Sequence, residues 1–188
     1  PLQKIVQAPV FKLEEINLPY SEYSDEDIKN RVIYVEASRG CPFKCEFCLS
    51  SLDKTVYPFE LGLFLNEMQT LFSRGVRSFK FIDRTFNLKI ATSIKIMSFF
   101  LEKMKHGVSE QEKIYLHFEL VPDHLPEKLK TTLLQFPQDS LQFEIGIQSL
   151  NPEIQETISR KQNNSQVVDN LNWIRQNTQA HIHADLII

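Results

Sequence analysis

The sequence predicts an α/β fold built on a parallel sheet, and three observations lead to that prediction. Short apolar segments with the composition of strands alternate with longer segments of helical periodicity. The helical segments are long enough to connect parallel strands as βαβ units. The chain has 188 residues, whereas a closed (β/α)₈ barrel typically needs about 250 residues. We therefore expect either an open arc of parallel strands or a doubly wound sheet.

Five segments have the composition of strands, and each runs into a polar loop. They are residues 31–36, 78–82, 115–120, 142–147 and 181–188. In both architectures the loops that follow the carboxyl ends of the strands gather at one rim, where binding and catalytic groups are placed. The rim is expected to consist of residues 41–48, 83–85, 119–124 and 148–149.

The connecting segments show helical spacing of their apolar residues. Helices are expected over residues 58–74, 89–105 and 126–136, and in two further segments that begin near residues 151 and 165. The first two have apolar faces made of Leu61, Leu65, Met68 and Phe72, and of Ile90, Ile94, Met97 and Leu101.

Residues suited to helix ends flank these segments. Gly75 and Gly107 are placed to end the first two helices. Asn151 is expected to cap a helix that has Pro152 in its first turn, and Ser165 is expected to cap the helix that follows.

The first thirty residues do not fit the alternation, so residues 1–30 are expected to be a linker or lead-in and residues 31–188 the core domain. The sequence stops in or just after the fifth strand, so we expect this domain to be incomplete, truncated at the C-terminus. The fifth strand would then be a sheet edge open to self-association with another chain.

Composition indicates a globular chain and excludes several classes of function. Hydrophobic residues make up 42% of the chain, and the net charge is −3. This charge predicts no strong non-specific binding to nucleic acid or anionic lipid. No apolar run reaches the roughly 20 residues that a membrane helix needs, and no signal peptide is recognisable at the start. We expect a cytoplasmic protein with no membrane contact.

The three cysteines are the most informative residues. Cys41, Cys45 and Cys48 lie within eight positions, and no other cysteine occurs. An odd, clustered set is not a disulfide framework. Thiolates at this C-x₃-C-x₂-C spacing suit zinc or an iron–sulfur cluster. Structural zinc sites use four protein ligands, and no second pair is present, so a cluster with one iron free of protein ligands is favoured.

Two other interpretations stay open at this stage. His181, His183 and Asp185 alternate along the fifth strand and share one face, as in zinc-dependent hydrolases, and Asp123 with His124 could add ligands. A non-catalytic module for metal binding or electron transfer is the third possibility. Both explain the cysteine motif less well than a substrate-binding cluster does.

The cysteine motif carries a resemblance. The pattern Cys41-x₃-Cys45-x-Phe47-Cys48, directly after a strand, resembles the signature of the radical S-adenosylmethionine (SAM) superfamily. Residues 81–87, 117–119, 143–149, 158–160 and 183–187 resemble further motifs of its β/α units, in the order expected. Together they resemble the branch whose members often carry an amino-terminal cobalamin-binding domain and, more distantly, the methylthiotransferases.

The resemblance implies a fold and a reaction. The fold would be a partial (β/α)₆ TIM-like barrel of which about five parallel strands are present. Cys41, Cys45 and Cys48 would hold a [4Fe–4S] cluster whose fourth iron binds SAM. An electron from a donor such as flavodoxin or ferredoxin would then cleave SAM to methionine and a 5′-deoxyadenosyl radical that acts on an unknown substrate. Cobalamin, if used, would belong to an N-terminal domain absent here, and this fragment alone would not be active.

The resemblance also implies roles for other rim residues. The loop with Asp83, Arg84 and Thr85 would bind the methionine amino group of SAM, and Arg160 its carboxylate. Glu119 and Glu144 would bind ribose hydroxyls, or they would form structural ion pairs. The remaining candidates for the cofactor cavity are Phe47, which would pack beside the adenine, Gln148 and Ser149.

Overall fold

The computed structural model describes residues 15–52, 55–105 and 113–187. Five strands form one parallel sheet in the order β1-β4-β5-β6-β7, and every neighbouring pair is parallel. The strands are β1 (Ile33–Val35), β4 (Ser78–Phe81), β5 (Tyr115–Leu120), β6 (Leu141–Gln148) and β7 (His181–Leu186). All five expected strands are therefore present. The sheet is open within the described residues, which confirms the α/β class and the partial barrel.

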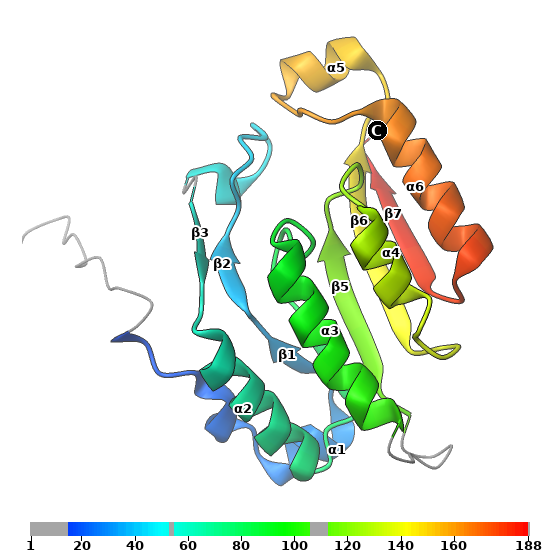
Figure 1. The fold of residues 1–188 in the computed structure, drawn as a ribbon. Helices are drawn as coiled ribbons and strands as arrows, with labels where there is room; N and C mark the ends of the chain where they lie inside the picture. The colour runs from blue at the N-terminus through cyan, green and yellow to red at the C-terminus, as the bar shows by residue number, and fades with distance from the viewer. Residues whose placement is uncertain (1–14, 53–54, 106–112, 188) are drawn as a thin grey trace, which may run out of the picture.

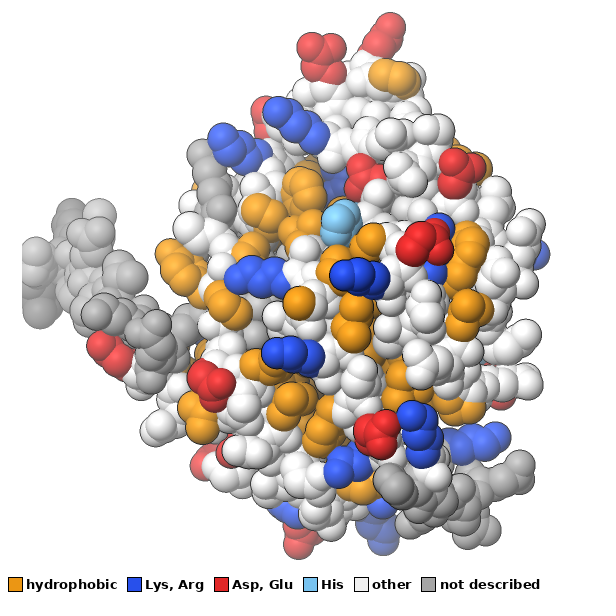
Figure 2. Space-filling view, viewed as in Figure 1, with side chains coloured by type: hydrophobic (Ala, Val, Ile, Leu, Met, Phe, Trp, Pro, Cys, Tyr) orange, Lys and Arg blue, Asp and Glu red, His pale blue; other side chains and the backbone are white. Residues whose placement is uncertain are grey.

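Helices α2, α3, α4 and α6 lie on one face of this sheet (Figure 1). The helices are α1 (Asp25–Asn30), α2 (Leu61–Ser73), α3 (Ile90–Lys105), α4 (Glu127–Leu133), α5 (Pro152–Thr157) and α6 (Asn164–Asn177). Basic and acidic side chains both occur over this helix-covered face (Figure 2). None of the described helices combines the length and the apolar character needed to cross a membrane.

The core lies between the sheet and these helices. Side chains of β6 alternate strictly between buried and partly exposed, so one face of the strand packs against the helices. Phenylalanine dominates this interface, and its fully buried members are Phe64, Phe79, Phe81, Phe100, Phe118 and Phe143. Most of these phenylalanine side chains therefore pack in the core. They hold the helices against the sheet that carries the rim loops.

A short hairpin that the sequence did not suggest changes the start of α2. Strands β2 (Ser38–Gly40) and β3 (Val56–Pro58) pair antiparallel, with Pro58 opposite Ser38. Pro58 therefore belongs to a strand and not to the first turn of a helix. The Glu60 carboxylate caps α2 instead, accepting the backbone N–H groups of Gly62 and Leu63 at 2.8 and 2.6 Å.

Some details of the expected helices were wrong. The buried face of α2 is Phe64, Met68 and Leu71, whereas Leu61 and Leu65 are only partly buried at its border. In α3, Met97 and Leu101 are buried as expected, together with Ser93, Ile96 and Phe100.

The helix caps are partly as expected. Asn151 caps α5 with Pro152 in the first turn, and Gly75 ends α2 with a φ of 103°. Ser165 is not a cap, because Asn163 caps α6 and the Ser165 hydroxyl donates to its side chain. Gly107 lies outside the described residues.

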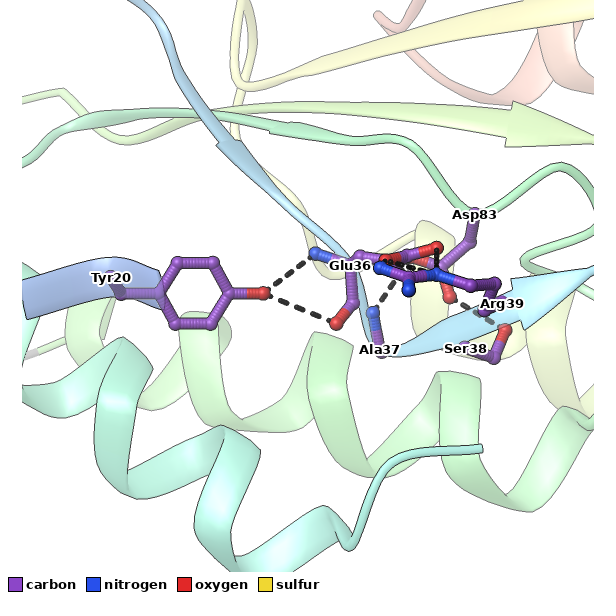
Figure 3. A network of polar contacts seen from close by, with 6 residues as sticks. All are labelled: Tyr20, Glu36, Ala37, Ser38, Arg39 and Asp83. Carbon is purple, nitrogen blue, oxygen red and sulfur yellow. Dashed lines mark hydrogen bonds and ion pairs between the residues drawn. The ribbon is translucent and has the colours of Figure 1, made fainter. Parts of the chain in front are cut away.

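The described part of the lead-in is structured. Ser24 and Asp27 form a reciprocal capping box at the start of α1. Tyr20 is buried, and its hydroxyl donates to the carbonyl of Glu36 at 3.2 Å and accepts the Glu36 N–H at 2.8 Å (Figure 3). This segment therefore supports the chain just where β1 ends and the cysteine loop approaches.

Candidate functional site

A cavity of about 400 Å³ lies at the carboxyl ends of the strands. This volume is within the range of small-molecule sites, about 300–1,000 Å³. Most of the residues expected at the site line it, and these are Cys41, Cys45, Phe47, Cys48, Arg84, Thr85, Glu119, Glu144, Gln148 and Arg160. The structure therefore brings together residues from five separate loops and strands at the rim.

The three cysteines surround this cavity as free thiols. Cys45 is buried, and Cys41 and Cys48 are partly buried. Burial raises the pKa of the Cys41 thiol above its ordinary value. Among the described residues, no three His, Cys, Asp or Glu side chains are already grouped closely enough to hold an ion. The thiols thus face one space without forming a preassembled centre.

Gly40 explains how the chain enters the cysteine loop. It has a φ of 98°, and a Cβ atom built on it would lie 2.0 Å from the carbonyl oxygen of Thr55. Only glycine tolerates both the left-handed backbone and this close approach. The residue directly before Cys41 is therefore determined by the β2–β3 hairpin and not by the chemistry of the thiols.

Arg160 lies against the cysteine loop. Its Nη1 atom donates to the Cys45 sulfur at 3.6 Å, its Nε atom donates to Gln162 at 3.1 Å, and its Nη2 atom donates to the carbonyl of Gly146. The guanidinium is thereby held on the cavity wall in contact with one of the thiols. The charge of Arg160 also opposes the effect of burial on the nearby Cys41 thiol, because it lowers the pKa of that group.

Glu119 and Glu144 lie opposite each other on β5 and β6. Adjacent carboxylates repel, and each one here has a basic partner. Arg84 is 3.5 Å from Glu119, and Lys80 is 3.3 Å from Glu144. Burial raises the pKa of Glu119. Both carboxylates therefore form ion pairs and also line the cavity, so the two roles considered for them are compatible.

Two expected site residues do not line the cavity. The Asp83 carboxylate is buried and accepts the N–H of Ala37 at 2.9 Å and the hydroxyl of Ser38 at 2.7 Å (Figure 3). It therefore holds the start of the cysteine loop and is not free to bind an ammonium group. Ser149 does not line the cavity either: its hydroxyl accepts the N–H of Asn151 at 3.1 Å, and its carbonyl accepts the side-chain amides of Gln155 and Gln162.

Asp83 is expected to make stability depend on pH. Burial raises its pKa from 3.8 to about 6, so the folded chain retains a proton that the unfolded chain releases. The contribution of Asp83 to the free energy of unfolding should then fall by about 3 kcal/mol as pH rises from about 4 to about 6, and stay level above that. Urea denaturation across this range, compared with Asp83→Asn, measures the contribution. If the free energy of unfolding changed with pH in the same way in the two proteins, this expectation would be contradicted.

Several cavity residues were not expected from the sequence. Ser50, Ser51 and Gln162 line the cavity. Asn87 lies behind it, where its side chain accepts the N–H of Val121 at 2.7 Å and donates to the Val121 carbonyl at 2.9 Å. A signal for Asn87 did exist, because a buried asparagine next to a rim loop usually satisfies backbone groups.

The histidines of β7 do not form a metal site. His181 and Asp185 are four residues apart on a strand, which separates their Cα atoms by about 13 Å. His181 lies 3.4 Å from Asp139, away from the rim, and only Asp185 of the three lines the cavity. Asp123, a possible further ligand, accepts the N–H of Asn163 instead. The arrangement of a zinc hydrolase is therefore not supported.

An open parallel sheet thus carries three free thiols and an arginine around a cavity at its carboxyl rim, the edge at which α/β proteins place their binding sites. A comparison with protein families gives the particular family. The model of the Radical SAM superfamily matches residues 35–187. The chain belongs to this superfamily, and the expectation from the cysteine motif is confirmed.

Solved structures of similar fold come from the same superfamily. One is the radical SAM methyltransferase TsrM from Kitasatospora setae, with cobalamin and a [4Fe-4S] cluster bound, at a TM-score of 0.66 and 16% identity over 82% of this chain. Another is the cobalamin-dependent SAM radical enzyme OxsB, with aqua-cobalamin and SAM bound, at a TM-score of 0.65 and 16% identity over 84%. This chain covers 28% and 24% of those two proteins. None of the curated proteins matches it significantly.

Proposed function

We propose that this chain is the SAM-binding core of a radical SAM enzyme, in which Cys41, Cys45 and Cys48 hold a [4Fe–4S] cluster. One observation carries the proposal. Three free thiols line a single cavity, and the Arg160 guanidinium reaches the sulfur of the most buried one, Cys45, at 3.6 Å. A soft, three-thiol donor set fits an iron–sulfur cluster with one open iron better than it fits zinc.

The cluster would supply one electron for reductive cleavage of the SAM sulfonium to methionine and a 5′-deoxyadenosyl radical. The chain's own residues bind and orient. Arg160 offsets the negative charge of the thiolates and offers N–H donors to the SAM carboxylate. Glu119 and Glu144 present acceptors for ribose hydroxyls, Phe47 offers an aromatic face for the adenine, and Gln148 adds an amide to the cavity wall.

The buried position of Asp83 changes the residues proposed to bind the amino group of SAM. Because its carboxylate is occupied, the methionine amino group would be bound by other acceptors of the same loop, such as the Thr85 hydroxyl or backbone carbonyls, with Arg84 held nearby by Glu119. The proposal further includes a cytoplasmic electron donor such as flavodoxin or ferredoxin. The cobalamin-bound neighbours favour cobalamin on another domain, with either a transferase or an oxidoreductase outcome.

Anaerobic reconstitution with iron and sulfide tests the proposal. We expect about four irons and four sulfides per chain, the absorption of a [4Fe–4S] cluster, and a change in its reduced electron paramagnetic resonance spectrum when SAM is added. Dithionite-reduced samples would then be assayed for 5′-deoxyadenosine and methionine. Uptake of one zinc per chain, with no spectral response to SAM, would reject the proposal.

A further inference from the structure

The cysteine loop is tied directly to the segment that joins α5 to α6. The backbone N–H of Glu46 donates to the carbonyl of Ile158 at 3.0 Å. The Ser159 hydroxyl donates to the Glu46 carboxylate at 2.8 Å, and Arg160 contacts the Cys45 sulfur. We call these five residues the latch. Two consecutive residues of the loop therefore meet three consecutive residues from a distant part of the chain.

The latch joins parts of the rim that the sheet holds apart. The cysteine loop follows β1 and β2 in the chain, whereas the Ile158–Arg160 side follows β6 and α5. Strands β4 and β5 lie between β1 and β6 in the sheet. At the usual spacing between strands, this separation is about 14 Å along the sheet. The contacts of the latch span this separation directly.

Ser159 has an unusual backbone for its residue type. Its φ is 54°, in the left-handed region where glycine or asparagine is preferred at the end of a helix. The Ser159 N–H donates to the Glu156 carbonyl and the Arg160 N–H to the Gln155 carbonyl, which closes the end of α5. Glycine would adopt this conformation without strain, but it has no hydroxyl. The hydrogen bond to Glu46 therefore explains why a serine is found at this strained position.

We propose that Glu46 and Ser159 are positioning residues, which hold the thiol side of the cavity at a fixed distance from Arg160 and so set the affinity for SAM. This inference rests on the proposed function. Glu46 is not expected to touch SAM or the cluster, because its carboxylate is engaged by Ser159. Its side chain is exposed, so its bond contributes little to global stability. The effect should therefore be clearest in ligand binding and in local opening, and small in global unfolding.

Three variants separate positioning from a general loss of structure. Glu46→Ala and Ser159→Ala each remove one partner of the hydrogen bond, whereas Glu46→Gln retains an acceptor for the Ser159 hydroxyl. In reconstituted chains, we expect the first two to weaken SAM binding about fivefold, with unchanged iron and sulfide content and only a small fall in the unfolding midpoint. Glu46→Gln should remain within about twofold of the original chain.

A second measurement does not depend on the cluster. Without reconstitution, hydrogen exchange of the Glu46 amide should be about fivefold faster in Glu46→Ala and Ser159→Ala than in Glu46→Gln. If the original chain takes up no cluster, the proposed function fails, and the exchange rates alone then decide whether the latch exists. Equal SAM affinity or equal exchange in Glu46→Ala and the original chain, or equal losses in Glu46→Ala and Glu46→Gln, would overturn the inference.

Discussion

Replacing Cys45 with alanine is expected to abolish uptake of iron and sulfide while the chain still folds. The thiol is small and buried at the cavity wall, and the Nη1 atom of Arg160 donates to its sulfur at 3.6 Å. Its removal therefore costs little packing, about 1 kcal/mol. A cluster held by three thiolates loses a third of its protein ligands, so we expect complete loss of the cluster absorption and of SAM cleavage.

Ser50→Ala provides a matched control for this experiment. Ser50 lies in the same region, lines the same cavity and is also partly buried. Its substitution should leave the iron and sulfide content unchanged, because no expected ligand is removed. Global unfolding of Cys45→Ala, seen by circular dichroism, would instead mean that the thiol holds a structural metal on which folding depends.

Phe81→Ala is expected to have the largest effect on stability. Phe81 is fully buried on β4, and its ring centroid lies 4.5 Å from that of Phe118 and 5.4 Å from that of Phe86. Phe64 and Phe100 contact it from the helices at 6.0 and 6.1 Å. Losing this ring leaves a cavity at the centre of the core and should lower the free energy of unfolding by about 3–5 kcal/mol.

Urea denaturation followed by circular dichroism measures this loss. Leu134→Ala, at a side chain that is 55% exposed just after α4, is the control and should change stability by less than about 0.5 kcal/mol. Because typical domains have only about 5–15 kcal/mol of stability, Phe81→Ala should be close to the limit of folding. A loss below about 1 kcal/mol would show that neighbouring rings collapse into the space.

The sheet could be predicted from the sequence because its signals are local. The strands are short apolar segments between polar loops, and β5 begins and ends where its composition suggests. The β2–β3 hairpin could not be predicted in this way. Each of its strands has three residues, and Pro58 at its end also fits the first turn of a helix. Only the pairing of Pro58 with Ser38 distinguishes the two structures.

The site was predictable where residue type determines the chemistry. Three clustered cysteines have few alternative uses, and they line the cavity as expected. The buried position of Asp83 was not predicted, because a carboxylate at the end of a strand can face either the rim or the protein interior. Its partners, Ala37 and Ser38, are 46 and 45 positions away and give no local signal. The same reasoning explains why the contact between Glu46 and Ser159 was missed.

The distance along the chain between the latch residues also bears on the order of folding. Glu46 and Ser159 are 113 positions apart, and Cys45 and Arg160 are 115 apart. Closing a chain segment of this length costs entropy before the contact at its ends forms. We therefore expect the sheet and helices to assemble first and the cysteine rim to close last. A metal centre would accordingly bind to a chain that is already folded. The supply of metal would then limit the formation of the centre, and it would not limit the folding of the chain.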